Sequence, residues 1–210
     1  MHIWSTIKNY MMNEKFKSYD FFQILKLICF KVRTFFIFRN ARLIRFPIDI
    51  RGKSFMKIGS GFTTGVGCRL EAYPEKDNKV LVIGDNFQMN DYVHITAMES
   101  VKIGENVLFA SKIYISDCSH GSYAGDENDS SPLEIPKNRK MVSKPVTIED
   151  NVWLGEFVSV LPGVTIGKGT IVGANSVVSK NLPPNVIAVG SPAIPIKKYN
   201  FETQKWEKIN

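Results

Sequence analysis

The sequence of 210 residues is poor in the residues that build disulfide frameworks and metal centres. It holds three cysteines, Cys29, Cys68 and Cys118, an odd number with no Cys-x-x-Cys pair. This argues against a disulfide-stapled fold and against a zinc site built from cysteine, so we predict no metal cofactor. A reducing cytoplasm is the simplest setting for such a chain.

Long hydrophobic runs are also missing. The most apolar segment, 21–38, is interrupted by Gln23, Lys26, Lys31 and Arg33. It is too short and too charged to cross a bilayer, which needs about 20 apolar residues. No apolar stretch is followed by a small-residue cleavage site, so no secretory signal is indicated. We therefore expect a cytoplasmic protein.

Charge of one sign dominates only near the N-terminus. The net charge is +7, and the excess of lysine and arginine lies between Lys8 and Lys57. A basic segment on a near-neutral body favours attachment to a surface over a groove for nucleic acid. The sequence shows no glycine-rich phosphate loop and no helix-turn-helix pattern, which argues against nucleic acid as a partner.

What the sequence does contain is a repeat of six residues. An aliphatic residue returns at every sixth position in the series Ile148, Leu154, Val160, Ile166, Val172 and Val178. A helix would repeat at about 3.6 residues and a half-buried strand at about 2. A period of six instead indicates short strands joined by tight corners, with three strands to a coil. Glycine follows several of these residues, where it relieves crowding and can adopt backbone angles closed to other residues.

The same period continues upstream. Two runs (Ile83, Met89, Ile95 and Ile103, Phe109, Ile115) precede the main series, and a weaker set (Ile58, Thr64, Leu70) precedes them. The polar stretch 73–79 interrupts the repeat as a loop. Residues 119–144 interrupt it again, and we expect them to leave the body as an excursion loop. A single coil cannot bury its apolar face, so neighbouring coils must stack.

These repeats resemble those of the hexapeptide-repeat acyltransferases. The match is most specific in Asn151–Gly155, Leu161–Gly167, Gly173–Val178 and Val189–Ala193. The resemblance covers about residues 40–196. It implies an all-β fold, a left-handed parallel β-helix. We predict a basic, hydrophobic and partly helical arm over 1–50, the β-helix over 51–196 with its loop 119–144, and a tail over 197–210.

Within the family, Ile83–Asn86, Ile103–Leu108 and a loop histidine are similar to the galactoside, maltose and nodulation O-acetyltransferases. The segments Arg42–Pro47 and Cys68–Arg69 resemble the branch that acts on bacterial surface polysaccharide and lipopolysaccharide O-antigen. The resemblance implies an enzyme that moves an acetyl group from acetyl-coenzyme A to a sugar hydroxyl.

Such a transfer needs a base for the hydroxyl proton, and histidine titrates near neutral pH. Of the three histidines, His2 is terminal and His94 lies inside a repeat. His120 lies where the last regular coil runs into the excursion loop, and the resemblance makes it the general base. We expect Asp117 to orient its imidazole. The structural alternatives are a solvated loop histidine and a turn-forming aspartate.

The resemblance also suggests the binding residues. It places Asn90 at an acceptor contact, with a corner residue of tight backbone angles as the alternative. The family's acceptor-binding carboxylate falls on Met98, and Glu99 is the neighbouring candidate. For acetyl-coenzyme A it implies a pocket lined by Trp153, Gly155, Ala174, Ser179, Lys180 and Lys197. Because the family's coenzyme groove lies between neighbouring prisms, we expect a homotrimer.

Several alternatives stay open. A γ-class carbonic anhydrase shares the prism but needs three histidines on zinc, and only His94 and His120 are available. An antibiotic-inactivating acetyltransferase and a non-catalytic scaffold are further possibilities. Segment 21–38 either lies on an anionic membrane surface or caps the open end of the solenoid.

Overall fold

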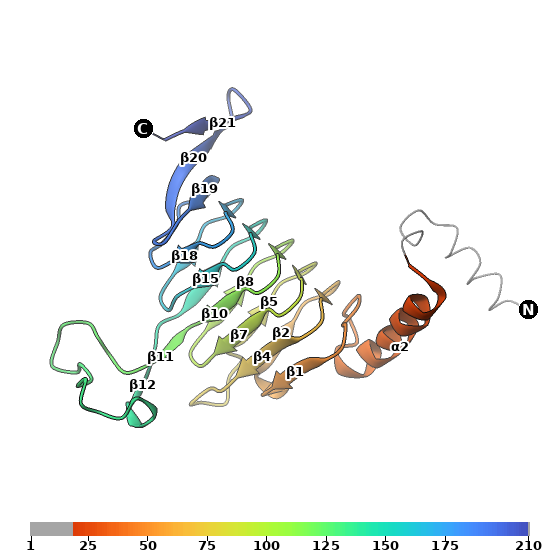
Figure 1. The fold of residues 1–210 in the computed structure, drawn as a ribbon, viewed down its shortest axis with the longest axis horizontal. Helices are drawn as coiled ribbons and strands as arrows, with labels where there is room; N and C mark the ends of the chain where they lie inside the picture. The colour runs from red at the N-terminus through yellow and green to blue at the C-terminus, as the bar shows by residue number, and fades with distance from the viewer. Residues whose placement is uncertain (1–18, 210) are drawn as a thin grey trace, which may run out of the picture.

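The six-residue repeat folds into short parallel strands that stack in three sheets. The computed structural model describes residues 19–209. The chain visits the three sheets in turn, so each coil contributes one strand to each sheet and equivalent strands of successive coils pair in parallel. Figure 1 shows the coils stacked into a prism, with the helix α2 at one end and the strands β19, β20 and β21 at the other.

We name the three sheets A, B and C. Sheet A runs β3 (Thr63–Thr64), β6 (Gln88–Met89), β9 (Leu108–Phe109), β14 (Trp153–Leu154), β17 (Ile171–Val172), β19 (Val186–Val189), β20 (Ile194–Asn200) and β21 (Lys205–Lys208). Sheet B runs β1 (Ile48–Arg51), β4 (Cys68–Ala72), β7 (His94–Ala97), β10 (Tyr114–Ser116), β15 (Ser159–Val160) and β18 (Val177–Val178). Sheet C runs β2 (Met56–Ile58), β5 (Leu81–Ile83), β8 (Val101–Ile103), β13 (Val146–Ile148) and β16 (Thr165–Ile166), and a short 3-10 helix, η2 (Lys53–Phe55), precedes β2.

The repeat residues fill the core, as predicted. All six members of the series from Ile148 to Val178 are at most 1% exposed. Burying one such side chain stabilises a fold by about 1.5–3 kcal/mol. Toward the N-terminal end the filling is aromatic, since the ring of Phe87 lies 5.7 Å from that of Phe62 and 4.8 Å from that of Phe109.

The corners need small residues because successive coils touch there. A Cβ atom on Gly84 would lie 2.7 Å from the carbonyl carbon of Gly104 in the next coil, so no larger residue fits. The left-handed backbone angles occur two residues later, at Asn86 (φ 56°) and Asn106 (φ 55°). Asparagine visits this region more readily than most residues. The repeat glycines therefore relieve crowding, as predicted, whereas asparagine supplies the unusual angles at these two corners.

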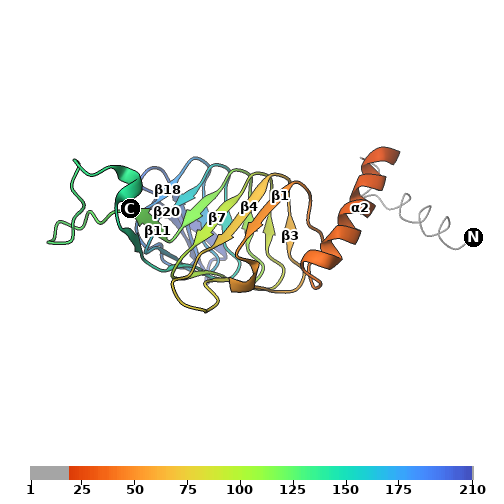
Figure 2. The same cartoon turned by 90° about the horizontal axis from the view of Figure 1, so that it is seen from below.

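The excursion over 119–144 is more regular than a loop. It starts as a hairpin in which β11 (Cys118–His120) pairs antiparallel with β12 (Met141–Ser143), and it contains a short 3-10 helix, η3 (Pro136–Asn138). Pairing satisfies the backbone hydrogen-bonding groups of a segment that has left the solenoid. Figures 1 and 2 both show the excursion projecting from the prism.

The predicted N-terminal helix is present as α2 (Phe21–Ile37). The Asp20 side chain accepts a hydrogen bond from the backbone N–H of Gln23, and the Gln23 side chain accepts one from that of Asp20, which is a capping box. The helix packs on the start of the solenoid, where Ile44 N–H donates to Thr34 Oγ1 at 2.8 Å. The side of α2 that carries Ile24, Phe30 and Thr34 is buried and thus faces the solenoid.

The opposite side of α2 is apolar and exposed. It presents Phe21, Phe22, Leu25, Ile28, Val32, Phe35 and Phe36. Among residues 19–209, no helix is long and apolar enough to span a membrane. At the other end of the chain, β20 crosses the expected boundary at 196. Together with β21 it extends sheet A as an antiparallel ribbon, so the predicted C-terminal tail over 197–210 is paired to the solenoid.

Candidate active site

The predicted site residues lie mainly along the two edges of sheet B. At the edge where the chain passes from sheet A to sheet B lie Asn90, Gly155 and Ala174. At the edge where it passes from sheet B to sheet C lie Glu99, Asp117, Ser179 and Lys180. The hairpin that carries His120 starts from this second edge. The outer face of sheet B therefore lies between the two groups.

His120 is the last residue of β11, and its side chain is exposed. Two hydrogen bonds hold the backbone at and next to His120. The Gly121 N–H donates to the Lys140 carbonyl at 2.9 Å, and the Tyr123 hydroxyl donates to the His120 carbonyl at 2.6 Å. Arg139 donates to the same hydroxyl at 2.8 Å. The scaffold holds the main chain of His120 and leaves the imidazole free to meet a reactant.

Asp117 does not contact the imidazole of His120. Its fully buried carboxylate accepts hydrogen bonds from the backbone N–H groups of Met98, Glu99 and Ser100, at 2.8–3.1 Å. No hydrogen bond joins Asp117 to the His120 ring within residues 19–209. These bonds use the carboxylate oxygens to fix the corner after β7. Asp117 thus anchors the base of the hairpin, a role different from the predicted orientation of the base.

The two predicted acceptor residues are both exposed and lie at opposite ends of the segment that contains β7. Asn90 accepts a long hydrogen bond of 3.4 Å from the Gln88 side chain. The positive φ of this corner falls on Tyr92 (58°), so Asn90 is not the residue that adopts the tight angles. The backbone N–H of Glu99 donates a hydrogen bond to the Asp117 carboxylate. The side chain of Glu99 is exposed beside the base of the hairpin.

The structure aligns two of the predicted coenzyme residues on the outer face of sheet A. Trp153 pairs with Ile171, which pairs with Ile187, which pairs with Lys197. Trp153 is 48% exposed. We call these four residues, Trp153, Ile171, Ile187 and Lys197, the Trp153 row. The row is apolar on three strands and ends in the cation of Lys197. The spacing of these residues in the sequence does not reveal that they are aligned. An apolar strip with a terminal positive charge matches a ligand that has an apolar arm and a phosphate.

Gly155 and Ala174 are neighbours at the same corner. A Cβ atom on Gly155 would lie 2.7 Å from the Ala174 nitrogen, so only glycine lets these coils stack. Ser179 and Lys180 are exposed at the other edge of sheet B, on the corner that follows β18. The six predicted coenzyme residues thus form two groups. Trp153, Lys197, Gly155 and Ala174 lie on sheet A or at the corner next to it, whereas Ser179 and Lys180 lie at the edge of sheet B that bears the hairpin.

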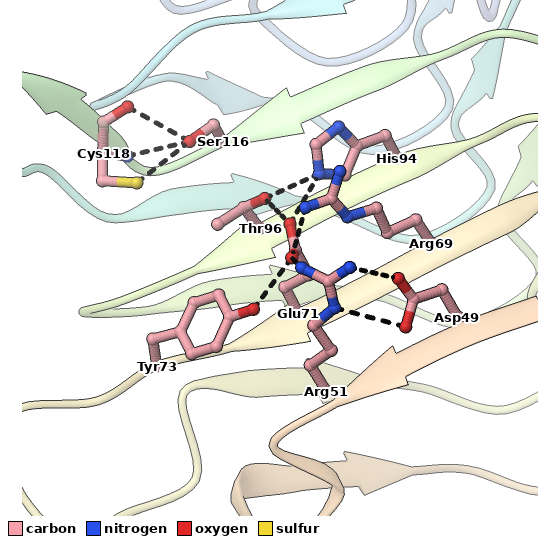
Figure 3. Close-up of polar contacts among 9 residues, drawn as sticks. All are labelled: Asp49, Arg51, Arg69, Glu71, Tyr73, His94, Thr96, Ser116 and Cys118. Atoms are coloured by element: carbon pink, nitrogen blue, oxygen red, sulfur yellow. Dashed lines mark hydrogen bonds and ion pairs between the residues drawn. The ribbon is translucent and has the colours of Figure 1, made fainter. Parts of the chain in front are cut away.

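Sequence reasoning missed a polar cluster on the outer face of sheet B, which we call the Glu71 network. Figure 3 shows its members, Asp49, Arg51, Arg69, Glu71, Tyr73, His94 and Thr96. The Glu71 side chain is only 5% exposed and accepts hydrogen bonds from five side chains, among them Arg69 at 2.7 Å and His94 at 2.8 Å. The only signal in the sequence was the alternation of these polar residues with buried aliphatic ones.

The contacts of Glu71 fix its charge. Burial alone would raise the pKa of this carboxyl, but hydrogen bonds from His94, Arg69 and Tyr73 outweigh burial and lower the pKa to about 2. An ionised carboxylate only accepts hydrogen bonds, so His94 must donate to it through Nε2–H. The other ring nitrogen, Nδ1, then points away from Glu71, as Figure 3 shows.

The thiols of Cys118, at the start of the hairpin, and of Cys68, on β4, are not activated. Burial raises the pKa of Cys118, which contacts the Ser116 hydroxyl at 3.3 Å. Burial likewise raises the pKa of Cys68. A nucleophilic cysteine needs a depressed pKa. Neither of these two thiols is therefore prepared to act as a nucleophile. In the described part of the chain, no three His, Cys, Asp or Glu side chains gather as metal ligands do.

The six-residue repeat that builds this solenoid is also the repeat of a known transferase family. The family profile "Bacterial transferase hexapeptide (six repeats)" matches residues 145–180. The chain is 46% identical over 192 residues to an Escherichia coli K12 protein named "Putative lipopolysaccharide biosynthesis O-acetyl transferase WbbJ", covering 91% of this chain and 96% of that protein. The chain belongs to the hexapeptide-repeat acyltransferase family.

One further relative and one solved structure are also similar to this chain. The galactoside O-acetyltransferase of Escherichia coli K12 is 41% identical over 118 residues, which cover 56% of this chain and 54% of that protein. The crystal structure of AntD, an N-acyltransferase from Bacillus cereus in complex with dTDP and 3-hydroxybutyryl-CoA, matches with a TM-score of 0.63 at 21% identity. That match covers 79% of this chain and 83% of AntD, and at this identity it shows the fold alone.

Proposed function

We propose that this enzyme is an O-acetyltransferase that moves an acetyl group from acetyl-coenzyme A to a sugar hydroxyl in the biosynthesis of surface polysaccharide or lipopolysaccharide O-antigen. The observation that carries the proposal is the 46% identity, over 91% of the chain, to a protein named for lipopolysaccharide O-acetylation. The hairpin-borne His120 supports it, because a fixed backbone with a free imidazole suits proton transfer.

In this mechanism His120 takes the proton from the acceptor hydroxyl while the hydroxyl oxygen attacks the thioester carbon. The new C–O bond forms, the C–S bond breaks, and the proton passes from His120 to the departing sulfur. The Asp117 carboxylate holds the base of the hairpin in place through its hydrogen bonds to the backbone N–H groups of residues 98–100, and it does not exchange protons. Asn90 and Glu99 bind the acceptor from the two ends of the β7 segment.

The Trp153 row suits the coenzyme. Trp153 and Gly155 would line the pantetheine arm, and Lys197 would meet a phosphate at the end of the row. Ala174, Ser179 and Lys180 would complete the contacts along sheet B. This assignment rests on the alignment of an apolar strip with a terminal cation on one outer face.

We further propose that the solenoid winds left-handed and that three chains assemble into a trimer. The Trp153 row supports assembly, since it leaves apolar side chains at the surface of a single chain. In a cyclic trimer one chain's row faces a different surface of its neighbour, which repeats the same site three times. His120, exposed on its hairpin, would then meet the coenzyme groove between two chains.

The exposed apolar side of α2 supports a place at the cytoplasmic face of the membrane. Basic residues lie beside it, with Lys26 and Arg33 on one flank and Lys31 on the other. Apolar side chains bordered by cations suit the interface of an anionic bilayer. Membrane contact is compatible with capping, because the helix packs on the solenoid through its other side.

An acceptor screen tests the proposed function. Purified protein and acetyl-coenzyme A would be incubated with methyl glycosides and short glycans, and the products weighed by mass spectrometry. We expect a gain of one acetyl group on a sugar, lost on base treatment as an ester. Transfer only to an amine, or only to chloramphenicol, would contradict the proposal.

A further inference from the structure

The three outer faces of the solenoid differ in chemistry. Sheet A presents the Trp153 row. Sheet C presents a row that consists of Lys57, Val82, Lys102, Thr147 and Thr165. Within residues 19–209 no side-chain hydrogen bond joins the members of that second row. Sheet B carries the Glu71 network, in which charged and polar side chains from β1, β4 and β7 are bonded together.

The network is fixed before any ligand arrives. Glu71 lies at its centre and holds Arg51, Arg69 and His94 at 2.7–3.0 Å. Arg51 is held a second time by Asp49, at 2.6 Å. Long side chains normally lose conformational freedom when they bind a ligand, and that loss weakens binding. Side chains that Glu71 already orders would bind a ligand without much of that loss.

Several groups of the network keep unused hydrogen-bonding capacity. The Arg69 side chain is 41% exposed and donates one hydrogen bond to Glu71 through Nη2, which leaves its other terminal nitrogen, Nη1, for a ligand; its Nε–H is buried and has no partner within residues 19–209. His94 offers Nδ1 on the side away from Glu71. Next to His94 on the neighbouring strand lies Tyr114, 40% exposed and edge-on to the imidazole with the ring centroids 5.5 Å apart.

The charges of the network balance. Two guanidiniums, Arg51 and Arg69, face two carboxylates, Asp49 and Glu71. An anion or a metal ion would meet both signs at close range. An uncharged hydroxyl, which donates and accepts, matches such a surface better. The ring of Tyr114 adds an apolar surface suited to the C–H face of a sugar.

The position of the network connects it to the proposed reaction. His94 and Thr96 lie on β7, between the two proposed acceptor residues Asn90 and Glu99. Thr96 pairs with Ser116, the last residue of β10, and the hairpin that carries His120 begins two residues later. An acceptor that reaches His120 from this side would extend over the network.

We propose that the Glu71 network and Tyr114 bind a second, uncharged sugar residue of the acceptor glycan, next to the sugar that is acetylated. This rests on the proposed sugar acetylation and deepens it, because it makes an oligosaccharide the preferred acceptor. Glu71 is a positioning residue, and Arg69, His94 and Tyr114 contact the second sugar.

The test compares each acceptor as a methyl glycoside and as a trisaccharide, using galactose, glucose and N-acetylglucosamine. We expect kcat/KM at least about tenfold higher for the productive trisaccharide, which corresponds to about 1.4 kcal/mol. Arg69→Met should remove most of this preference by raising KM for the trisaccharide, with kcat and the methyl glycoside little changed. Tyr114→Ala should act in the same direction. Lys102→Met, on sheet C, is the matched control and should keep the preference.

Two results would overturn the inference while leaving the proposed function intact. One is an equal effect of Arg69→Met on both acceptor lengths, or no preference in the unaltered enzyme. The other is competition by inorganic phosphate that depends on Arg69, which would make the network an anion site. If no sugar is acetylated at all, the proposed function fails in this panel. Saturation-transfer NMR with the trisaccharides then decides the inference, since binding that Arg69→Met abolishes supports it and absent binding overturns it.

Discussion

The Nε2 atom of His94 lies 2.8 Å from Oε2 of Glu71, and this contact joins two strands that are 23 residues apart in the sequence. The pair belongs to the network that holds the pKa of Glu71 at about 2, against an ordinary value of 4.5. A carboxyl whose pKa is depressed in the folded state stabilises the fold above its unfolded pKa. That contribution is lost as the pH falls through the folded value.

Acid unfolding should therefore report on Glu71. Between about pH 4.5 and pH 2 we expect the free energy of unfolding to fall by up to about 3 kcal/mol on account of this group. Glu71→Gln should lower stability at pH 7, since it leaves Arg69 without its carboxylate partner and Arg51 with Asp49 alone, and should flatten the acid slope. Chemical denaturation at a series of pH values measures both. Glu99→Gln, at an exposed site, is the control, and parallel slopes for the unaltered and Glu71→Gln proteins would disprove the assignment.

His120 should be the general base. We expect His120→Ala to lower kcat by about 10²–10⁴-fold, the usual contribution of a positioned base. Acetyl-coenzyme A affinity and assembly should stay nearly unchanged, because no hydrogen bond or ion pair within residues 19–209 ties the imidazole of His120 to the fold. With a methyl glycoside acceptor, His94→Ala should change kcat much less. The assignment is reversed if His94→Ala abolishes turnover and His120→Ala does not, and the mechanism is wrong if both variants remain active.

Asp117 should act through the hairpin. Asp117→Asn removes the charge from hydrogen bonds to three backbone N–H groups, and charged hydrogen bonds contribute about 1.5–3 kcal/mol each. We expect lower kcat, together with faster amide hydrogen exchange at residues 98–100 and along the hairpin. The shape of the pH–rate profile should persist. A displaced profile with normal exchange would mean that Asp117 tunes His120 directly.

Assembly should depend on the Trp153 row. Mass photometry should give three times the chain mass of 23.7 kDa. Ile171→Glu places a charge in the middle of the apolar row and should shift the protein to monomers with little activity, whereas Lys102→Glu on sheet C should leave the trimer intact. A fully active monomer would contradict the proposed assembly.

The exposed side of α2 should bind anionic membranes. We expect the protein to co-sediment with vesicles of phosphatidylglycerol and phosphatidylcholine, and less with phosphatidylcholine alone, because the flanking cations require negative charge. Replacing Phe22 and Phe36 by serine should weaken sedimentation several-fold without changing the melting temperature, since both side chains point to solvent. Equal sedimentation of the double variant would show that this side faces something other than lipid.

The sequence determined the solenoid because its rule is local. Each member of the series from Ile148 to Val178 lies six positions from the next, so the coil, its core and the position of His120 next to the excursion could be predicted without knowing any long-range contact. The helix was also predictable, since its cap at Asp20 and Gln23 is formed within four residues.

Only the tertiary structure decided which side chains on the outer faces of the sheets contact one another. Arg51 contacts Glu71 across 20 residues, but Thr96 contacts Glu71 across 25, because the loop after β4 lengthens that coil. An outward side chain shows no six-residue signature, and its neighbours depend on the register of stacked coils. Asp117 and His120 are only three residues apart, but the neighbouring coil and the hairpin separate their side chains. One points into the corner after β7, and the other leaves on a hairpin.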